Sequence, residues 1–542
     1  MKMRPEEGPS TEWLPVNISD PTYPSSDIKV GLVNVKKTLG IETEYGIIHK
    51  GVTEPNPIIA SSLLINAYLH AHSTADRGPS APRPGWDFIH ETPDKDLRGF
   101  DSPESIAPEI EAHMVNAVLT NGSRYYVDHA HPELSSPECA DPLSVVKYDC
   151  AADQILISSM EAAKEILPPG QELVVYKNNS DGKGNSYGCH ENYLVNRGTS
   201  FERIADHATT HFITRQVFTG AGKVGCEISG RSRSEIPFQI TQRADFFEEP
   251  IGLETTLKRP IINTRDEPHA DPAKYRRLHV IVGDANLCQV ATFLKVGTTA
   301  IVLSMIESDA LNKIIKFKDP VRSLQEVSFD LQLNTPLELI DGSTSTALEI
   351  QWWLYGQAKE YVDKFGTENI GGDSAELVLH WWEKVLTSLD SPNNLETLVG
   401  VLDWVTKKHI LDGFQERKKI NSMDPQLAAI DLQYHDLRPH KSLFKKVHQE
   451  TLVSETDTHV AVKNPPEDTR AYFRGKCLTK WPEDIVSANW DSLVFDSGEK
   501  NLQRVPMLEP LRGTRQQTED LIENSNSVSE LLKRLEENIR DD

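Results

Sequence analysis

Apolar and polar residues alternate along residues 39–47, a pattern that predicts a β-strand with one apolar and one polar face. The polar face carries Gly40, Glu42, Glu44 and Gly46. Residues two apart on a strand lie about 7 Å apart on the same face, so the two carboxylates point the same way. Neighbouring carboxylates repel unless they share a proton or a cation, and oxygen ligands in open space suit Mg²⁺. The segment therefore fits a magnesium site as well as it fits a solvated strand face with incidental acids.

Residues 124–131 show a similar alternation and predict a second strand, which Pro132 ends. Tyr126 and Asp128 fall on one face of this strand, and Glu133 follows in the turn. This strand therefore adds acids of the same kind as those of the first.

Two further segments place a histidine on the polar face of a predicted strand. Residues 173–176 and 187–193 flank a polar turn and predict a β-hairpin, with His190 on its polar face. His279 takes the same kind of position in residues 276–284. If these strands form an antiparallel sheet with helices behind its apolar face, the acids and histidines gather in one trough. Carboxylates with a few histidines suit two or more Mg²⁺ or Mn²⁺ ions better than Zn²⁺.

Helical periodicity recurs between and after these strands. We predict helices over residues 56–72, 145–166, 207–218 and 300–317, more of them between residues 348 and 437, and a C-terminal one from residue 525. The elements predict three parts of the chain: a disordered tail over residues 1–36, a catalytic domain over 37–440, and a small C-terminal domain over 441–542.

A long connection, residues 73–101, interrupts the catalytic domain. Its first half, residues 73–85, is rich in Gly, Pro and Ser and predicts a mobile segment. Trp86 and Phe100 bracket its second half. Long loops in compact domains tend to be functional, so we expect this half to dock near the catalytic mouth and to gate it.

Composition limits the classes of function. The chain has 542 residues, 38% hydrophobic and 25% charged, as is usual for a globular protein. A net charge of −24 argues against nonspecific binding to nucleic acid or to an anionic membrane. We expect no bilayer-spanning run and no secretory signal. The six cysteines include no Cys-x-x-Cys pair, which is typical of reduced thiols in a cytoplasmic protein.

Two weaker motifs have simpler interpretations. His129, His131 and Cys139 are zinc-ligand types, but their spacing matches no standard zinc site. Residues 181–184, Asp-Gly-Lys-Gly, lack the full phosphate-loop pattern, so we expect them only to close the hairpin.

A set of arginines could hold phosphates or carboxylates through paired hydrogen bonds. Its members are Arg243, Arg259, Arg265, Arg276 and Arg277. Together with the trough, these arginines describe a nucleotide–metal site that faces an anionic substrate.

With these residues in view, the sequence resembles the family of the Pup ligases and the Pup deamidase/depupylases. The resemblance runs from about residue 37 to about residue 512 and rests on long motifs in the same order. They are Gly-Ile-Glu-Thr-Glu-Tyr-Gly (40–46), Tyr-Val-Asp-His-Ala-His-Pro-Glu (126–133), Ser-Tyr-Gly-Cys-His-Glu-Asn-Tyr (186–193), and longer stretches at 176–184, 257–271, 276–286 and 466–475.

The resemblance implies an α+β fold like that of glutamine synthetase and the carboxylate–amine ligases. In that fold a curved antiparallel sheet, backed by helices, cradles the nucleotide, and a small C-terminal domain packs against it. The implied cofactors are ATP, or ADP with phosphate, and Mg²⁺. The implied partners are Pup, a small disordered tagging protein, and pupylated proteins, with a functional link to the proteasome.

Two features favour the deamidase/depupylase branch of the family. One is the loop pattern Trp86-Asp87…Arg98-Gly99-Phe100-Asp101, since the ligases lack this loop. The other is Asp-His-Ala-His-Pro-Glu at 128–133. The loop argues against the alternative of a Pup–protein ligase, and the complete acid and histidine set argues against an inactive Pup-binding regulator.

The resemblance also implies roles for single residues. Asp128 matches the catalytic aspartate, which acts either as nucleophile or as general base. The metal and nucleotide shell is matched by Glu42, Glu44, Tyr126, Glu133, His190 and His279. Residues near the phosphates or Pup's terminal residue are Arg243 and Arg265. Residues that flank the nucleotide from the small domain are Arg470, Arg474 and Trp490.

Overall fold

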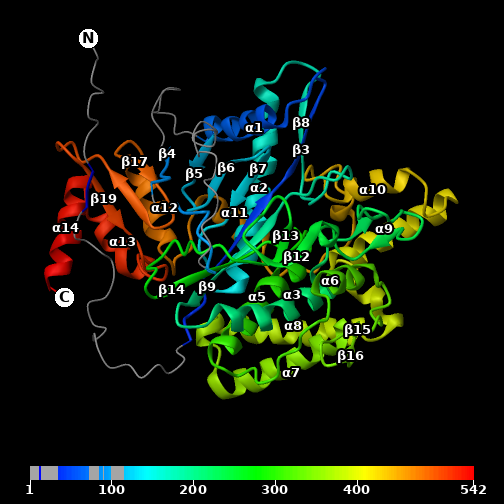
Figure 1. Ribbon diagram of the computed structural model, residues 1–542. Helices are drawn as coiled ribbons and strands as arrows, with labels where there is room; N and C mark the ends of the chain where they lie inside the picture. Colours follow the sequence, from blue (N-terminus) through cyan, green and yellow to red (C-terminus); the bar gives the residue numbers. More distant parts are fainter. Residues whose placement is uncertain (1–10, 14–33, 73–84, 90, 99–114, 542) are drawn as a thin grey trace, which may run out of the picture.

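The computed structural model describes residues 11–13, 34–72, 85–89, 91–98 and 115–541 (Figure 1). Among these residues, six strands form the central sheet in the order β14-β9-β2-β7-β6-β5, and every neighbouring pair is antiparallel. They are β2 (Leu39–Glu44), β5 (Asn116–Val118), β6 (Arg124–Asp128), β7 (His131–Ser135), β9 (Cys189–Asn196) and β14 (Tyr275–Val280).

The register of this sheet aligns the predicted polar residues. Glu42 lies opposite His190, and Glu44 lies opposite Glu133. On the other face of β2, Leu39 and Ile41 are buried in the main core. The alternation read from the sequence therefore corresponds to one buried face and one face that opens into a trough.

Helices cover the apolar face of the sheet (Figure 1). The main core includes residues of α2 (Pro142–Ile166), α3 (Phe201–Thr214), α5 (Gln289–Glu307) and α8 (Asp373–Leu389). Asp141 caps α2 by accepting from Leu143 N and Ser144 N, and Pro142 occupies the first turn. The other helices of this domain are α1 (Pro57–Ala71), α4 (Gln216–Thr219), α6 (Pro320–Phe329), α7 (Ala347–Phe365), α9 (Asp403–Lys418), α10 (Gln426–Tyr434) and α11 (Glu455–Lys463).

The predicted hairpin is wrong. β8 (Glu172–Tyr176) pairs with β3 (Gly46–Lys50), whereas β9 pairs with β2 and β14. The turn between β8 and β9 is closed by an isolated β-bridge between Ser180 and Ser186 and by a hydrogen bond from Tyr187 N to the Asn179 carbonyl oxygen, but β8 and β9 themselves lie in different sheets. The remaining short pairs are β10 (Lys223–Val224) with β11 (Phe238–Gln239), β12 (Phe247–Gly252) with β13 (Arg259–Asn263), and β15 (Leu337–Glu338) with β16 (Thr344–Ser345).

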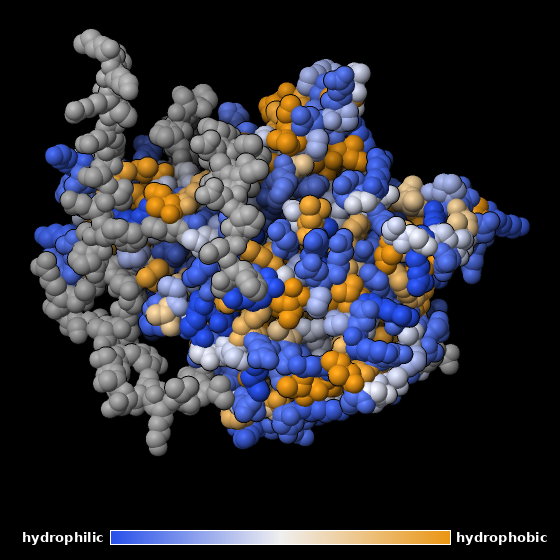
Figure 2. Space-filling view, viewed as in Figure 1, coloured by the Kyte–Doolittle hydropathy of each residue, from blue (hydrophilic) through white to orange (hydrophobic). Residues whose placement is uncertain are grey.

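Helix α5 corrects two further expectations. It spans Gln289–Glu307 instead of residues 300–317, because Asp309 adopts a left-handed conformation (φ 57°) just beyond its end. By length and composition alone it could cross a membrane, contrary to our reading of the apolar runs, yet 94% of its most apolar window is buried inside the protein. On the face shown in Figure 2, hydrophobic residues lie in small patches among hydrophilic ones.

A second sheet organises the small C-terminal domain. Its strand order is β1-β19-β18-β17-β4, formed by β17 (Ile485–Ala488), β18 (Ser492–Phe495) and β19 (Leu502–Pro506) with β1 (Thr11–Trp13) and β4 (Gly85–Trp86). It shares a core with α12 (Ala471–Lys480), α13 (Arg515–Glu523) and α14 (Val528–Asp541). Together with the helix-backed sheet, this domain confirms the predicted α+β architecture.

The C-terminal boundary of the predicted catalytic domain and the predicted tail both need correction. Phe444, Val453 and Ala461 lie in the main core, and α11 packs against α2. The turn near Pro439 is therefore a local break, and the stretch from 441 to 463 belongs to the large domain. In the predicted tail, β1 pairs in parallel with β19, so these three residues join the small domain instead of a disordered segment. Residues 1–10 and 14–33 lie outside the described part.

The segment around Trp86 joins the two domains. β4 pairs with β17, and the Asp87 carboxylate pairs with Arg504 at 2.5 Å. The Trp86 ring is 7% exposed and lies edge-on to Trp490, and the Arg124 guanidinium stacks over it at 4.0 Å. Trp86 therefore packs at the junction with the small domain, and docking near the catalytic mouth stays a prediction. Residues 73–84, Phe100 and Asp101 lie outside the described residues, and gating stays a prediction.

The burial of Trp86 changes the outcome expected for its replacement. We expect Trp86→Ala to lower the free energy of unfolding of the small domain by about 3 kcal/mol, because a buried ring leaves a cavity. Urea denaturation followed by circular dichroism measures this effect. Ile89→Ala is the matched control in the same segment, because Ile89 is 72% exposed. Equal stability of the two variants would contradict the packing role.

Candidate active site

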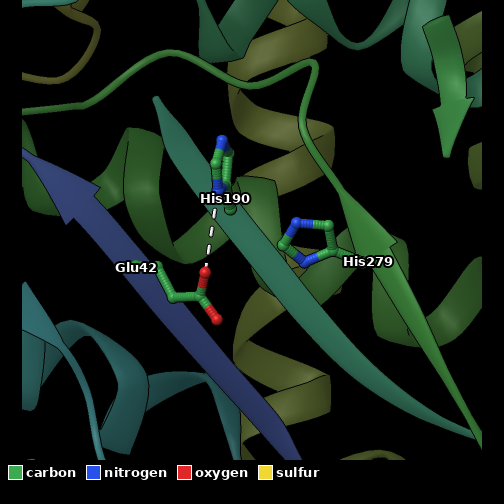
Figure 3. Close-up of side chains that lie close together, drawn as sticks. All are labelled: Glu42, His190 and His279. Carbon is green, nitrogen blue, oxygen red and sulfur yellow. Dashed lines mark ion pairs between the residues drawn. The ribbon is translucent and has the colours of Figure 1, made fainter. Parts of the chain in front are cut away.

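The first group of donors lies where β2, β9 and β14 run side by side. Ligand atoms of Glu42, His190 and His279 lie within 4.8 Å of one another (Figure 3). The Glu42 carboxylate is 3.6 Å from His190 Nδ1, and the two imidazole rings are 5.0 Å apart. The strand register explains why these three side chains lie close together. Glu42 on β2 lies opposite His190 on β9, and His279 lies on β14, the next strand of the sheet.

Asn192 orients this group from beside it. Its amide donates to Glu42 Oε1 at 2.8 Å, and its oxygen lies 3.0 Å from His279 Nδ1. This contact, shorter than the 3.4 Å from Arg277 to the same nitrogen, favours a proton on Nδ1, which leaves Nε2 to serve as a ligand. Burial, followed by the charge of Arg277, holds the pKa of His279 well below its usual value, so the ring is neutral. The periodicity of β9 could have identified Asn192, two residues after His190.

The second group consists of acids from β2, β6 and β7. Ligand atoms of Glu44, Asp128 and Glu133 also lie within 4.8 Å of one another. Asp128 Oδ2 is 3.0 Å from His129 Nδ1, and Glu44 Oε2 is 3.5 Å from His131 Nδ1. We predicted a catalytic role for Asp128 and a metal-binding role for the other two acids, and the structure brings all three together. His131 was considered only for zinc.

Charge in the trough is strongly unbalanced. Burial raises the pKa of Glu133 well above its usual value, and Asp128, Glu44 and Glu42 raise it further. Glu44 behaves differently, since His131, His190 and Arg243 overcome its burial and lower its pKa to about 2. Several acids in one buried trough are unfavourable without a cation. The donor set of carboxylates and neutral imidazoles fits divalent cations such as Mg²⁺ or Mn²⁺.

Tyr126 lies beside the acids but belongs to neither group. Its hydroxyl is 3.4 Å from Ser135 Oγ, and its ring stacks on the Arg124 guanidinium at 4.0 Å. Burial and the charge of Glu133 raise the pKa of its phenol well above the usual value. Tyr126 therefore lies next to the acid group, and its role in the metal shell stays a prediction.

Two arginines line the trough near Glu44. Arg243 is 1% exposed and donates to the carbonyl oxygen of Ile281. Burial, followed by the charge of Arg259, lowers its pKa to about 10. Arg259 donates to the carbonyl oxygen of Ser186 at 3.0 Å. Because these arginines use carbonyl oxygens as partners, their positive charge is available to an anion in the trough.

Arg265 lies against the second half of the long loop. Its backbone forms an isolated antiparallel β-bridge with that of Asp96, and Leu97 N donates to the Thr264 carbonyl oxygen at 2.9 Å. Arg98 pairs with Asp96 at 2.7 Å. Residues 91–98 of the loop therefore dock beside a residue expected to contact the substrate.

A mainly apolar pocket of about 80 Å³ lies between the sheet and the small domain. Its wall includes Ile41, Glu42, His269, Arg470 and Trp490. One end of this pocket therefore reaches the first donor group. The sequence analysis predicted Trp490 and Arg470 beside a nucleotide, and both line this pocket.

Arg474 differs from that expectation. It is 0% exposed, and its terminal nitrogens bond to Glu138 and to the carbonyl oxygens of Trp490 and Gly122. Arg470 pairs with the same Glu138 carboxylate at 2.6 Å. The role of Glu138 at the domain junction depends on residues more than 330 positions away.

We expect Glu138→Gln to weaken the junction between the domains. Breaking a buried ion pair by removing one partner costs about 3–5 kcal/mol. Burial raises the pKa of Glu138, but Arg474 and Arg470 lower it to about 2 from 4.5. A lowered pKa gives stability that is present above pH 4.5 and is lost as the pH falls through about 2.

Thermal unfolding between pH 7 and pH 3 checks this expectation. The difference in melting temperature between the wild type and Glu138→Gln should be largest near neutral pH and should shrink in acid. The control is Glu519→Gln, which removes an exposed pair with Arg515 and should change the melting temperature little. A pH-independent difference would contradict the assignment.

The fold and the site define a class: an α+β protein with a trough of acids, histidines and arginines on an antiparallel sheet, closed at one end by a small domain. The family model described as Pup-ligase protein matches residues 37–494. The chain belongs to this family, which confirms the resemblance found in the sequence.

Relatives of two kinds match the chain. The depupylase of Acidothermus cellulolyticus is 47% identical over 512 residues, which cover 92% of this chain and 99% of that protein. The Pup deamidase/depupylase of Mycolicibacterium smegmatis is 41% identical over 510 residues, with 92% and 100% covered. The Pup–protein ligase of the same organism is 35% identical over 435 residues, with 78% and 94% covered.

Solved structures of ligases share the fold. The crystal structure of the complex between Pup and its ligase PafA has a TM-score of 0.73 and 29% identity, covering 93% of this chain and 96% of that one. The structure of PafA in complex with ADP has a TM-score of 0.67 and 31% identity, covering 83% and 98%.

Proposed function

We propose that this protein hydrolyses amide bonds at the C-terminal residue of Pup: it deamidates a terminal glutamine to glutamate and cleaves the isopeptide bond that joins Pup to a lysine. The observation that carries this proposal is the difference between the two kinds of relatives. Proteins named depupylase match at 41–47% identity over 92% of the chain, whereas a ligase matches at 35% over 78%.

The cofactors we propose are ATP, or ADP with phosphate, and Mg²⁺. The ADP complex of the related ligase supports a nucleotide, and the pocket beside Trp490 and Glu42 is its proposed place. The two donor groups are the proposed places for divalent cations. When bound, these cations add positive charge that stabilises the developing oxyanion.

The residues of the chain supply the remaining steps of amide hydrolysis. Asp128 is the proposed catalytic residue. As a nucleophile it attacks the carbonyl carbon and displaces the protonated amine, and water then hydrolyses the resulting anhydride. As a general base it takes a proton from the attacking water and passes it to the leaving nitrogen as the C–N bond breaks. Arg243 and Arg259 place positive charge near the carbonyl and near anionic groups of the substrate. Binding in the trough orients the reacting amide toward Asp128.

We place the protein in the cytoplasm, acting on Pup and on pupylated proteins in the pathway that leads to the proteasome. Its net charge of −24 argues against nucleic acid and anionic membranes as partners.

The decisive experiment uses the full chain with ATP, Mg²⁺ and Pup that ends in glutamine. We expect ammonia and a Pup product one mass unit heavier, with terminal glutamate. A pupylated protein should release free Pup and the unmodified protein. The alternative of a ligase predicts the reverse: glutamate-ended Pup would become attached to a lysine with consumption of ATP. Formation of that conjugate, or the absence of either hydrolysis, would overturn the proposal.

A further inference from the structure

The turn between β8 and β9, residues 177–187, connects two walls of the trough. Arg243 Nε donates to Ser186 Oγ at 3.3 Å, on one side of this turn. On the other side, the Tyr187 ring lies over the ring of His131 with centroids 4.4 Å apart. A shift of this turn would therefore move both Arg243 and His131, the histidine that contacts Glu44 of the acid group.

Asn179 fastens the turn to the protein interior. Its side chain is 0% exposed, and its amide donates to the Tyr187 carbonyl oxygen at 3.1 Å. Its backbone N–H donates to Gln242 Oε1 at 2.6 Å. Gln242 immediately precedes Arg243, so the Gln242 side chain links the turn to the segment that carries the arginine.

His435 holds the Gln242 amide in the orientation that its contact with the Asn179 N–H requires. Lys407 Nζ lies 2.7 Å from His435 Nε2 and also pairs with Asp431 at 2.6 Å. A charged ammonium has only donors, so His435 Nε2 is an acceptor and the ring proton lies on Nδ1. The Gln242 amide is also 2.7 Å from Nε2. Gln242 must therefore present its NH₂ group to the histidine and its oxygen to Asn179.

We propose that His435 is a positioning residue for the active site, which fixes the Gln242 amide and thereby the turn that carries Ser186 and Tyr187. His435 also binds the turn directly, since its carbonyl oxygen accepts from Lys177 N at 3.0 Å. The inference rests on the proposed function, because turnover is one of its readouts.

The surroundings of His435 keep it in the required neutral form. The ring is 1% exposed, and burial, followed by the charge of Lys407, holds its pKa well below the usual value. The charged groups that face it are Lys407 from α9, Asp431 from α10 at 4.0 Å, and Lys177 from the turn. A protonated ring would lose the acceptor, and Gln242 could no longer hold both neighbours.

The first test compares replacements that keep or remove the acceptor. His435→Gln retains an oxygen acceptor near Nε2 and should keep kcat/KM for Pup within about threefold of the wild type. His435→Leu has no acceptor and should lower kcat/KM by about tenfold or more, because misplaced groups cost rate steeply. The matched control is His211→Leu, since His211 is also 0% exposed but contacts Thr299 and Trp382 in the core.

Hydrogen exchange gives a second readout that does not depend on turnover. Peptides that cover residues 177–187 should exchange faster in His435→Leu than in the wild type. In His211→Leu their exchange rate should equal that of the wild type. If His435→Leu and His211→Leu behave alike in both readouts, the positioning role is overturned. If the wild type fails to hydrolyse Pup, the proposed function fails, while the exchange data still decide the positioning role.

A third test uses pH and a variant that keeps the histidine. Lys407→Met removes the cation beside the ring and leaves the Asp431 carboxylate in place. The loss of the positive charge raises the pKa of His435. The acid limb of kcat/KM should therefore shift upward by at least about one pH unit. The shift should vanish in the double variant Lys407→Met/His435→Gln, which has no ring to protonate. No shift in the single variant, or the same shift in the double variant, would overturn the proposal.

Discussion

Asp128→Asn is expected to lower kcat for both deamidation and depupylation by about 10²–10⁴-fold while leaving nucleotide affinity near that of the wild type. The substitution keeps the shape of the side chain but removes the charge that a nucleophile or a general base requires. Asp128 is the acid of its group that is closest to solvent, with 27% of its side chain exposed. The first donor group and the pocket beside Trp490 remain intact in this variant.

Ammonia release from glutamine-ended Pup measures the loss, and calorimetry measures nucleotide affinity. Asp94→Asn is the charge-matched control, because Asp94 is an exposed acid in the loop segment, and it should retain activity. Near-normal deamidation by Asp128→Asn would refute the catalytic role. A loss of nucleotide affinity equal to the loss of activity would instead make Asp128 a metal ligand, as its place beside Glu44 and Glu133 allows.

The same system separates the two roles that remain open for Asp128. A nucleophile forms an anhydride with the substrate carbonyl, which hydroxylamine traps as a hydroxamate on the aspartate side chain or on Pup. A general base forms no covalent intermediate. Mass spectrometry of the quenched reaction distinguishes these outcomes.

Periodicity predicted the residues of the trough, because a period of two assigns each side chain to a face without knowledge of the fold. Glu42, Glu44, His190 and His279 were identified in this way. What periodicity cannot give is the partner of a strand. The sequence analysis paired the β9 segment with β8, since a polar turn lies between them, whereas β9 pairs with β2 and thereby brings His190 to Glu42.

Residues whose role depends on distant partners were beyond the sequence analysis. Arg474 was assigned to the nucleotide, but Glu138, from the other domain, binds its guanidinium. His435 was not singled out at all, because its importance arises from Lys407 and Gln242, which reach it from different elements. A buried polar group is recognised by its partners, and sequence distance conceals them.

Glu42→Ala and His279→Ala are expected to lower nucleotide affinity at limiting Mg²⁺ by about 10–100-fold, which is the usual effect of disturbing a metal site. Each variant removes one donor of the first group, and Asn192 ties the two donors together. The Glu42 charge also balances Arg277, 3.8 Å away, so its loss leaves excess positive charge in the trough. That excess positive charge would by itself raise the affinity for an anionic nucleotide. A lower nucleotide affinity in the variant would therefore result from weaker binding of the cation.

Calorimetric titration with ATP at low and high Mg²⁺ measures the effect. If the donors hold the cation, excess Mg²⁺ should partly restore affinity, because mass action offsets a weakened site. Glu161→Ala, which removes an exposed acid on α2, is the control for the change in net charge. Unchanged affinity at limiting Mg²⁺ would show that Glu42 and His279 hold no cation in the nucleotide complex. The second group, with Glu44, Asp128 and Glu133, would then be the remaining candidate, and Glu44→Ala would be the variant that loses affinity.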